Sequence, residues 1–147
     1  MLSTSIASER VGGDARLREI DGDHFDIEIF DPIVKRLMND ANYPWLVLVP
    51  RRAGASEIID LAEADRAQLM TEIVRTGHAL KTVTQCDKLN IAAIGNMVPQ
   101  LHVHIVARRL GDAAWPRPVW GAVPPLAYEH TAFAAFVAAV RREMRVG

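Results

Sequence analysis

The chain has 147 residues, a formal net charge of −1 and a hydrophobic fraction of one half, so it is long enough for one domain with a substantial core. The near-neutral charge disfavours a general nucleic-acid-binding protein, because such proteins carry a strong basic excess. The single cysteine, Cys86, excludes an internal disulfide and a cysteine-rich zinc site.

The N-terminal segment carries none of the usual targeting signals. Residues 1–14 are small, polar and glycine-bearing, and we expect them to form a flexible lead-in to one domain spanning residues 1–147. They lack the basic start and apolar run of a secretory signal. No segment approaches the roughly 20 apolar residues of a membrane span. We therefore expect a cytoplasmic protein that binds neither membranes nor nucleic acid.

The first half of the chain predicts three strands and a long helix. A strand is expected at 26–30, and four turn-forming residues join segments 33–38 and 45–49 into a hairpin. Residues 57–59 are expected to add a short extended piece. Residues 62–84 carry apolar side chains at helical spacing, which predicts a helix. Its expected buried stripe consists of Leu69, Met70, Ile73, Val74, Leu80 and Val83.

The second half predicts two further strands, at 88–94 and 101–109, and a closing helix over 128–144. The intervening segment 110–125 is rich in tryptophan, proline and glycine, and we expect it to be irregular. Its residues Trp115 and Trp120 could cover a ligand pocket, a partner subunit or the sheet of their own domain. Sequential hairpins with two helices imply an antiparallel α+β domain.

The stretch from Pro99 to Arg108, PQLHVHIVAR, is the most informative part of the chain. Its strict alternation is typical of a half-buried strand. One face would carry the apolar residues Leu101, Val103, Ile105 and Ala107. The other face would carry Gln100, His102, His104, Val106 and Arg108. Residues two apart on one face lie about 6.5–7 Å apart, so two imidazoles, a carboxamide and a guanidinium would share a row.

Such a row suits chemistry on a phosphate. An imidazole has an ordinary pKa of about 6.5 and is mostly neutral at pH 7. It can therefore attack phosphorus without bringing two anions together, and it would form a covalent intermediate. A second imidazole could protonate the leaving group. Arg108 could donate paired hydrogen bonds to the phosphate oxygens.

The spacing by itself leaves other interpretations open. A His-x-His pair also arises by chance on a strand, and two histidines can be part of a metal site. A metal generally needs a third and a fourth ligand, and no other histidine or carboxylate has an informative spacing. We therefore predict no metal site, and a metal-dependent His-x-His enzyme is the less favoured alternative.

The segment QLHVHIV resembles the signature of the histidine-triad (HIT) family of nucleotide hydrolases and transferases, in which three histidines alternate with apolar residues on one strand. Gln100 stands at the first histidine position, His102 at the second and His104 at the third. The segments YPWLVLVPRRAG, EIIDLAEADRAQLM and KLNIAAIGN resemble the family's proline-containing strand and basic turn, its helix, and the strand before the triad. The resemblance covers residues 33–109.

The resemblance implies a HIT-like fold, with an antiparallel sheet of about five strands, a central helix and a C-terminal helix, and it implies a homodimer. It also implies that His102 is the nucleophile and that His104 assists at the phosphate and the leaving group. Gln100 takes the place of a residue that orients the nucleophile. Glutamine cannot exchange a proton near neutral pH, so orientation could survive this replacement but a proton relay could not. Asn90 or Asn96 could bind the nucleotide.

The implied substrate is a purine nucleotide, either a nucleoside phosphoramidate or a dinucleoside polyphosphate, cleaved at the α-phosphorus through a nucleotidyl-His102 intermediate. No cofactor would be required, although a Mg-bound polyphosphate could be the true substrate. The alternative, motivated by Gln100, is a nucleotide-binding or interaction module with weak or lost turnover. The family's usual loop before the triad is replaced by residues 96–99, and Ala53 stands where a histidine is frequent. Both departures favour a divergent branch.

Overall fold

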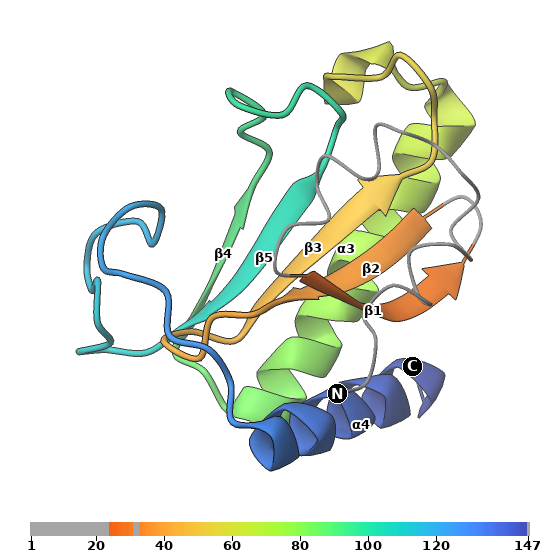
Figure 1. Cartoon of the computed structure of the whole chain (residues 1–147). Coiled ribbons are helices and arrows are strands. Elements are labelled where there is room, and N and C mark those ends of the chain that lie inside the picture. The colour runs from red at the N-terminus through yellow and green to blue at the C-terminus, as the bar shows by residue number, and fades with distance from the viewer. Residues whose placement is uncertain (1–23, 31–32, 147) are drawn as a thin grey trace.

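The computed structural model describes residues 24–30 and 33–146. The lead-in expected at 1–14 lies outside these residues. One antiparallel sheet of five strands, in the order β1-β2-β3-β5-β4, forms the centre of the molecule (Figure 1). Its strands are β1 (His24–Phe30), β2 (Ile33–Met38), β3 (Trp45–Pro50), β4 (Lys88–Ala92) and β5 (Val103–Arg108). Two helices, α3 (Glu63–Thr84) and α4 (His130–Val146), complete the fold.

The predicted α+β class, the five strands and the two helices are confirmed, with small changes at the boundaries. The prediction for one short segment was wrong. Residues 57–59 were expected to be extended, but a 3-10 turn spans Ile58–Asp60. The Asp60 carboxylate accepts hydrogen bonds from the backbone N–H groups of Ser56 and Glu57, and this cap favours a turn over an extended chain.

The helices cover one face of the sheet, and Figure 1 shows α3 passing behind β2 and β3. The core beneath them contains the apolar face of the triad strand, as predicted: Leu101, Val103, Ile105 and Ala107 are each at most 2% exposed. From α3 it takes Leu69, Ile73 and Leu80, and from α4 it takes Val137, Val140 and Met144.

The predicted stripe of α3 was wrong at Met70 and Val74, which are 59% and 50% exposed. The helix is instead turned so that Glu72 faces the sheet. There its carboxylate pairs with the Lys35 ammonium, and both side chains are buried. A buried charge needs a counter-charge. Hydrophobic periodicity cannot predict where such a pair forms.

Part of the opposite face of the sheet is covered by residues 110–125, which are irregular as expected. Ala114 and Val119 from this segment are buried against Val47, Val49 and Val106 on the strands. The segment therefore packs on the sheet of its own domain. No helix in the part of the chain described here is long and apolar enough to cross a membrane.

Candidate active site

The imidazole of His102 is oriented by the backbone of residue 100. His102 lies directly before β5 and is partly exposed. Its Nδ1 lies 2.7 Å from the carbonyl oxygen of Gln100. Because a carbonyl oxygen can only accept a hydrogen bond, Nδ1 carries the proton and the neutral ring keeps its lone pair on Nε2. The geometry thus leaves Nε2 as the basic, nucleophilic nitrogen.

The side chain of Gln100 does not take part in this contact. Its amide nitrogen donates to the carbonyl oxygen of Pro50 at 3.2 Å, and the residue is 4% exposed. Gln100 thus ties the start of the triad strand to the end of β3. The contact from position 100 to His102 is made by the main chain, whereas the side chain of Gln100 is bound to Pro50.

His104 lies in the interior of the sheet. Its cross-strand neighbours are Val47 on β3 and Ala92 on β4, and it is 8% exposed. The indole Nε1 of Trp45 donates a hydrogen bond to His104 Nδ1 at 3.0 Å. The second tryptophan, Trp120, meets the same imidazole edge-on at a centroid distance of 5.2 Å.

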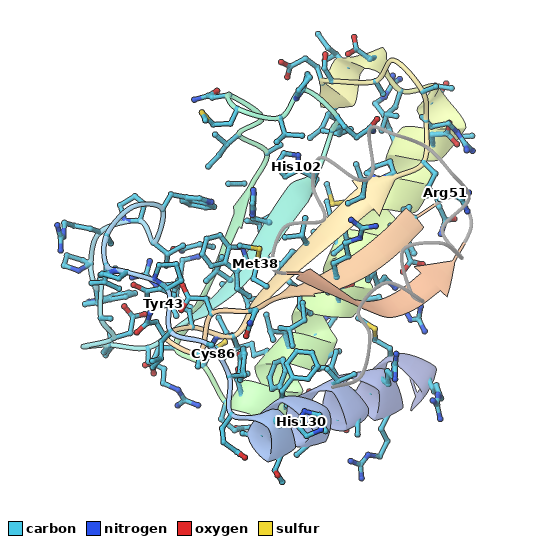
Figure 2. All side chains as sticks on the ribbon, in the orientation of Figure 1. Met38, Tyr43, Arg51, Cys86, His102 and His130 are labelled. Atoms are coloured by element: carbon cyan, nitrogen blue, oxygen red, sulfur yellow. The ribbon has the colours of Figure 1, made fainter. Side chains whose placement is uncertain are left out.

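The two imidazoles stand together as the alternation predicts. Their ring centroids are 5.0 Å apart and their planes make an angle of 70°. Figure 2 shows His102 at the end of β5 remote from Tyr43, near the loop that joins β4 to β5. One imidazole is therefore partly open to solvent, and its neighbour is enclosed by aromatic rings.

The predicted phosphate contact at Arg108 does not agree with the structure. The guanidinium is 1% exposed and forms a bidentate ion pair with Asp112, with distances of 2.8 and 2.9 Å. The Tyr43 and Trp115 rings lie 5.8 and 5.4 Å from its central carbon. The hydrogen bond from Arg108 holds the pKa of the Asp112 carboxyl down at about 2. This guanidinium anchors segment 110–125 and is not available to a phosphate.

The two candidate asparagines have different surroundings. Asn90 on β4 accepts a hydrogen bond from Arg108 at 2.8 Å through its side-chain oxygen, so that oxygen belongs to the same structural cluster. Asn96 is exposed in the loop between β4 and β5. Asn96 is exposed and Asn90 is partly exposed, so both asparagines stay predicted nucleotide contacts.

A cavity of about 350 Å³ is lined in part by Trp45 and Trp120, the two indole rings that contact His104, whereas neither histidine lines it. Trp45 and Trp120 form its wall on the histidine side. The remaining lining comes from the β2–β3 turn and the end of segment 110–125: Met38, Asn39, Asp40, Val119, Gly121, Val123 and Pro125. A mostly apolar cavity with a few polar groups is typical of small-molecule sites. In the described residues no group of three or more His, Cys, Asp or Glu side chains could hold a metal ion.

Comparison with known proteins places this site in a family. The model of the HIT domain matches residues 27–111, more than half of the chain. No significant match was found among curated protein sequences. Because the family model covers the triad strand and the sheet that holds it, the chain belongs to the HIT family.

Solved structures of histidine triad proteins are similar over nearly their whole length. One from Bradyrhizobium japonicum is 59% identical, with a TM-score of 0.83, and the match covers 89% of this chain and 96% of that one. One from Sinorhizobium meliloti 1021 is 40% identical, covering 88% and 94%, with a TM-score of 0.81. One from Marinobacter aquaeolei VT8 is 36% identical, covering 88% and 94%, with a TM-score of 0.83.

Sequence reasoning missed two residues of this site, Trp45 and Asp112. Trp45 is buried in the sheet, and its N–H group reaches His104. The signal was its position on a strand that pairs with the triad strand. Asp112 follows Arg108 by four residues across a turn, and this spacing of opposite charges could have indicated the pair.

Proposed function

We propose that this protein is a HIT-type hydrolase or transferase that acts on a purine nucleoside phosphoramidate or dinucleoside polyphosphate at the α-phosphorus. The reaction would pass through a covalent nucleotidyl-His102 intermediate. The observation that carries the proposal is the hydrogen bond from His102 Nδ1 to the Gln100 carbonyl, which leaves the lone pair on Nε2 of a partly exposed ring. A neutral, oriented imidazole is a competent nucleophile.

In the first step, the lone pair of His102 Nε2 forms a bond to the α-phosphorus, and the bond from phosphorus to the leaving nitrogen or oxygen breaks. The leaving group takes up the Nε2 proton of His104, whose ring stands 5.0 Å from that of His102, and His104 is left as an imidazolate whose Nδ1 accepts the N–H of Trp45. In the second step, water or another acceptor attacks the phosphorus, and the bond to His102 breaks. The proton lost by the attacking water returns to His104.

The cavity lined by Trp45 and Trp120 supports the choice of a nucleotide as substrate. Two indole rings border it, and aromatic side chains stack on nucleobases, with a contribution of about 1–3 kcal/mol per base. We propose that the base occupies this cavity, while the α-phosphate lies over His102 and within reach of Asn96. The partly exposed indole of Trp120 favours a purine, which has the larger ring system.

We propose that the protein supplies no metal of its own and that a polyphosphate substrate would bring Mg²⁺ with it.

A cytoplasmic location is also proposed, because the one cysteine, Cys86, is a free buried thiol and suits a reducing compartment.

We further propose that two copies of the chain associate. Strand β4 lies at the edge of the sheet, and exposed strand edges tend to pair with another chain. Its Ile91 is 50% exposed, and α3 exposes Met70 and Val74. A homodimer that joins the β4 strands of two copies would remove these apolar groups from water.

The direct test is the intermediate itself. The protein would be mixed with an adenosine phosphoramidate and examined by mass spectrometry under conditions that avoid acid, because the phosphorus–nitrogen bond is acid-labile. We expect an adenylyl adduct on the wild type and none on His102→Ala. Tight nucleotide binding without adduct or turnover would instead identify a binding module. Activity that disappears with a chelator would identify a metal-dependent enzyme.

A further inference from the structure

Trp45 reaches His104 because of the register of the sheet. Strand β3 pairs with β5 so that Val47 stands opposite His104 and Trp45 stands opposite Val106. Trp45 is two residues from Val47 on the same face, which makes it a diagonal neighbour of His104. Diagonal neighbours lie within reach of long aromatic side chains. The indole N–H therefore meets the imidazole from one side, at 3.0 Å from Nδ1.

This contact defines the protonation pattern of His104. An indole N–H can only donate a hydrogen bond, so His104 Nδ1 must be the acceptor and must carry a lone pair. In the neutral ring the proton then resides on Nε2. A proton on Nδ1 would face the indole proton and would break the bond. Since Trp45 is 5% exposed and His104 is 8% exposed, water has little access with which to compensate that loss.

The two histidines are consequently held as opposite tautomers. His102 has its proton on Nδ1, bound to the Gln100 carbonyl, and its lone pair on Nε2. His104 has its lone pair on Nδ1, bound to Trp45, and its proton on Nε2. Displacement of a basic leaving group, such as the nitrogen of a phosphoramidate, uses this division, because one nitrogen donates an electron pair while another delivers a proton to the leaving group.

We infer that Trp45 is a positioning residue that holds His104 in the Nε2–H tautomer, and so prepares it to protonate the leaving group. The catalytic part of this inference rests on the proposed function, whereas the tautomer itself does not. Trp120 is the natural comparison. It contacts the same imidazole edge-on at 5.2 Å, but the hydrogen bond to Nδ1 comes from Trp45 alone among the described contacts.

The tautomer is tested by nitrogen NMR of protein labelled with ¹⁵N-histidine at neutral pH. In the wild type we expect His104 Nδ1 to have the shift of an unprotonated acceptor and Nε2 that of a protonated nitrogen. In Trp45→Phe, which keeps a ring but lacks the donor, a measurable share of the proton should move to Nδ1. Trp120→Phe should retain the wild-type pattern. An unchanged pattern in Trp45→Phe would overturn the inference.

The catalytic consequence is tested with two adenylyl substrates, a phosphoramidate and a p-nitrophenyl ester. The phosphoramidate nitrogen must be protonated to leave, whereas p-nitrophenolate departs as an anion. For Trp45→Phe we expect kcat to fall about tenfold or more with the phosphoramidate, a part of the 10²–10⁴-fold that a general acid contributes. The ester should show no comparable loss of kcat, and any change in KM from weaker contact with the base should be the same for both substrates. Equal losses with both substrates would refute a role through the proton of His104.

Failure of the proposed function and failure of the Trp45 variant to fold are distinguishable. If the wild type acts on neither substrate, the proposed function fails, and the NMR pattern alone decides the tautomer. If Trp45→Phe does not fold, the ¹⁵N–¹⁵N coupling across the hydrogen bond from Trp45 Nε1 to His104 Nδ1 is measured in the wild type. Its detection supports the inference, and its absence from a well-resolved spectrum contradicts it.

Discussion

The backbone carbonyl of Gln100 accepts the hydrogen bond from His102 Nδ1, while the side-chain amide of the same residue donates to Pro50. A backbone carbonyl is present whatever residue occupies position 100. The orientation of the nucleophile therefore does not require the histidine that the HIT family usually has there. The interpretation of Gln100 as a sign of lost turnover is correspondingly weaker.

We expect Gln100→His to change kcat by less than about threefold, because the main-chain contact to His102 survives. Gln100→Ala should lower the free energy of unfolding by about 1 kcal/mol, since the Pro50 carbonyl loses its buried donor. Steady-state kinetics and urea denaturation measure these effects. A hundredfold gain in kcat for Gln100→His would show that the side chain itself has a catalytic role.

Alternation within one strand was sufficient to predict that His102 and His104 share a face, because side chains in strands repeat every two residues. The same rule put Arg108 on that face correctly. It could not predict that Asp112, beyond the end of the strand, would capture the guanidinium. Contacts formed across a turn depend on the turn's geometry, which periodicity does not describe.

Among the larger elements, segment 110–125 is irregular in backbone yet fixed to the sheet. Asp112 supplies much of this attachment. Its carboxylate binds Arg108 twice and also accepts hydrogen bonds from the backbone N–H groups of Arg109, Ala114 and Trp115. One side chain thus joins the end of β5 to the first turns of the segment that carries Trp120.

We expect Asp112→Asn to lower the free energy of unfolding by about 3 kcal/mol at neutral pH, because it leaves the buried Arg108 charge without its partner. The folded state holds the pKa of Asp112 down at about 2, from an ordinary 3.8. The wild-type advantage should therefore be complete above that ordinary value and fade as the pH falls toward 2. Urea denaturation at several pH values measures it. A difference independent of pH across this range would contradict the assignment.

Strands and helices were predicted well wherever hydrophobic periodicity decided the outcome. The exposed face of α3 was predicted incorrectly, because Glu72 faces the sheet and pairs with Lys35. Two charges that are distant in sequence leave no periodic signal. The sequence also left open whether Trp115 and Trp120 cover a ligand pocket, a partner subunit or the sheet of their own domain. Proline-rich irregular chain has no pattern that identifies the surface it packs on.

At the scale of the whole molecule, the edge of the sheet defines the expected assembly. We predict that light scattering after size exclusion gives twice the chain mass of 16.3 kDa. Ile91→Lys places a charge on β4 and should give a monomer, since charges on edge strands oppose pairing. Met97→Lys is the matched control: Met97 is 94% exposed in the loop after β4, and its replacement should leave the dimer intact. A monomeric wild type would refute the proposed association.

The central claim is that His102 attacks phosphorus through Nε2, and the trapped intermediate tests it most directly. Protein labelled with ¹⁵N-histidine would be mixed with an adenosine phosphoramidate, quenched in alkali and examined by ³¹P and ¹⁵N NMR. The account predicts a phosphorus nucleus coupled to Nε2 of His102. A bond to Nδ1, or to a residue other than His102, would contradict it.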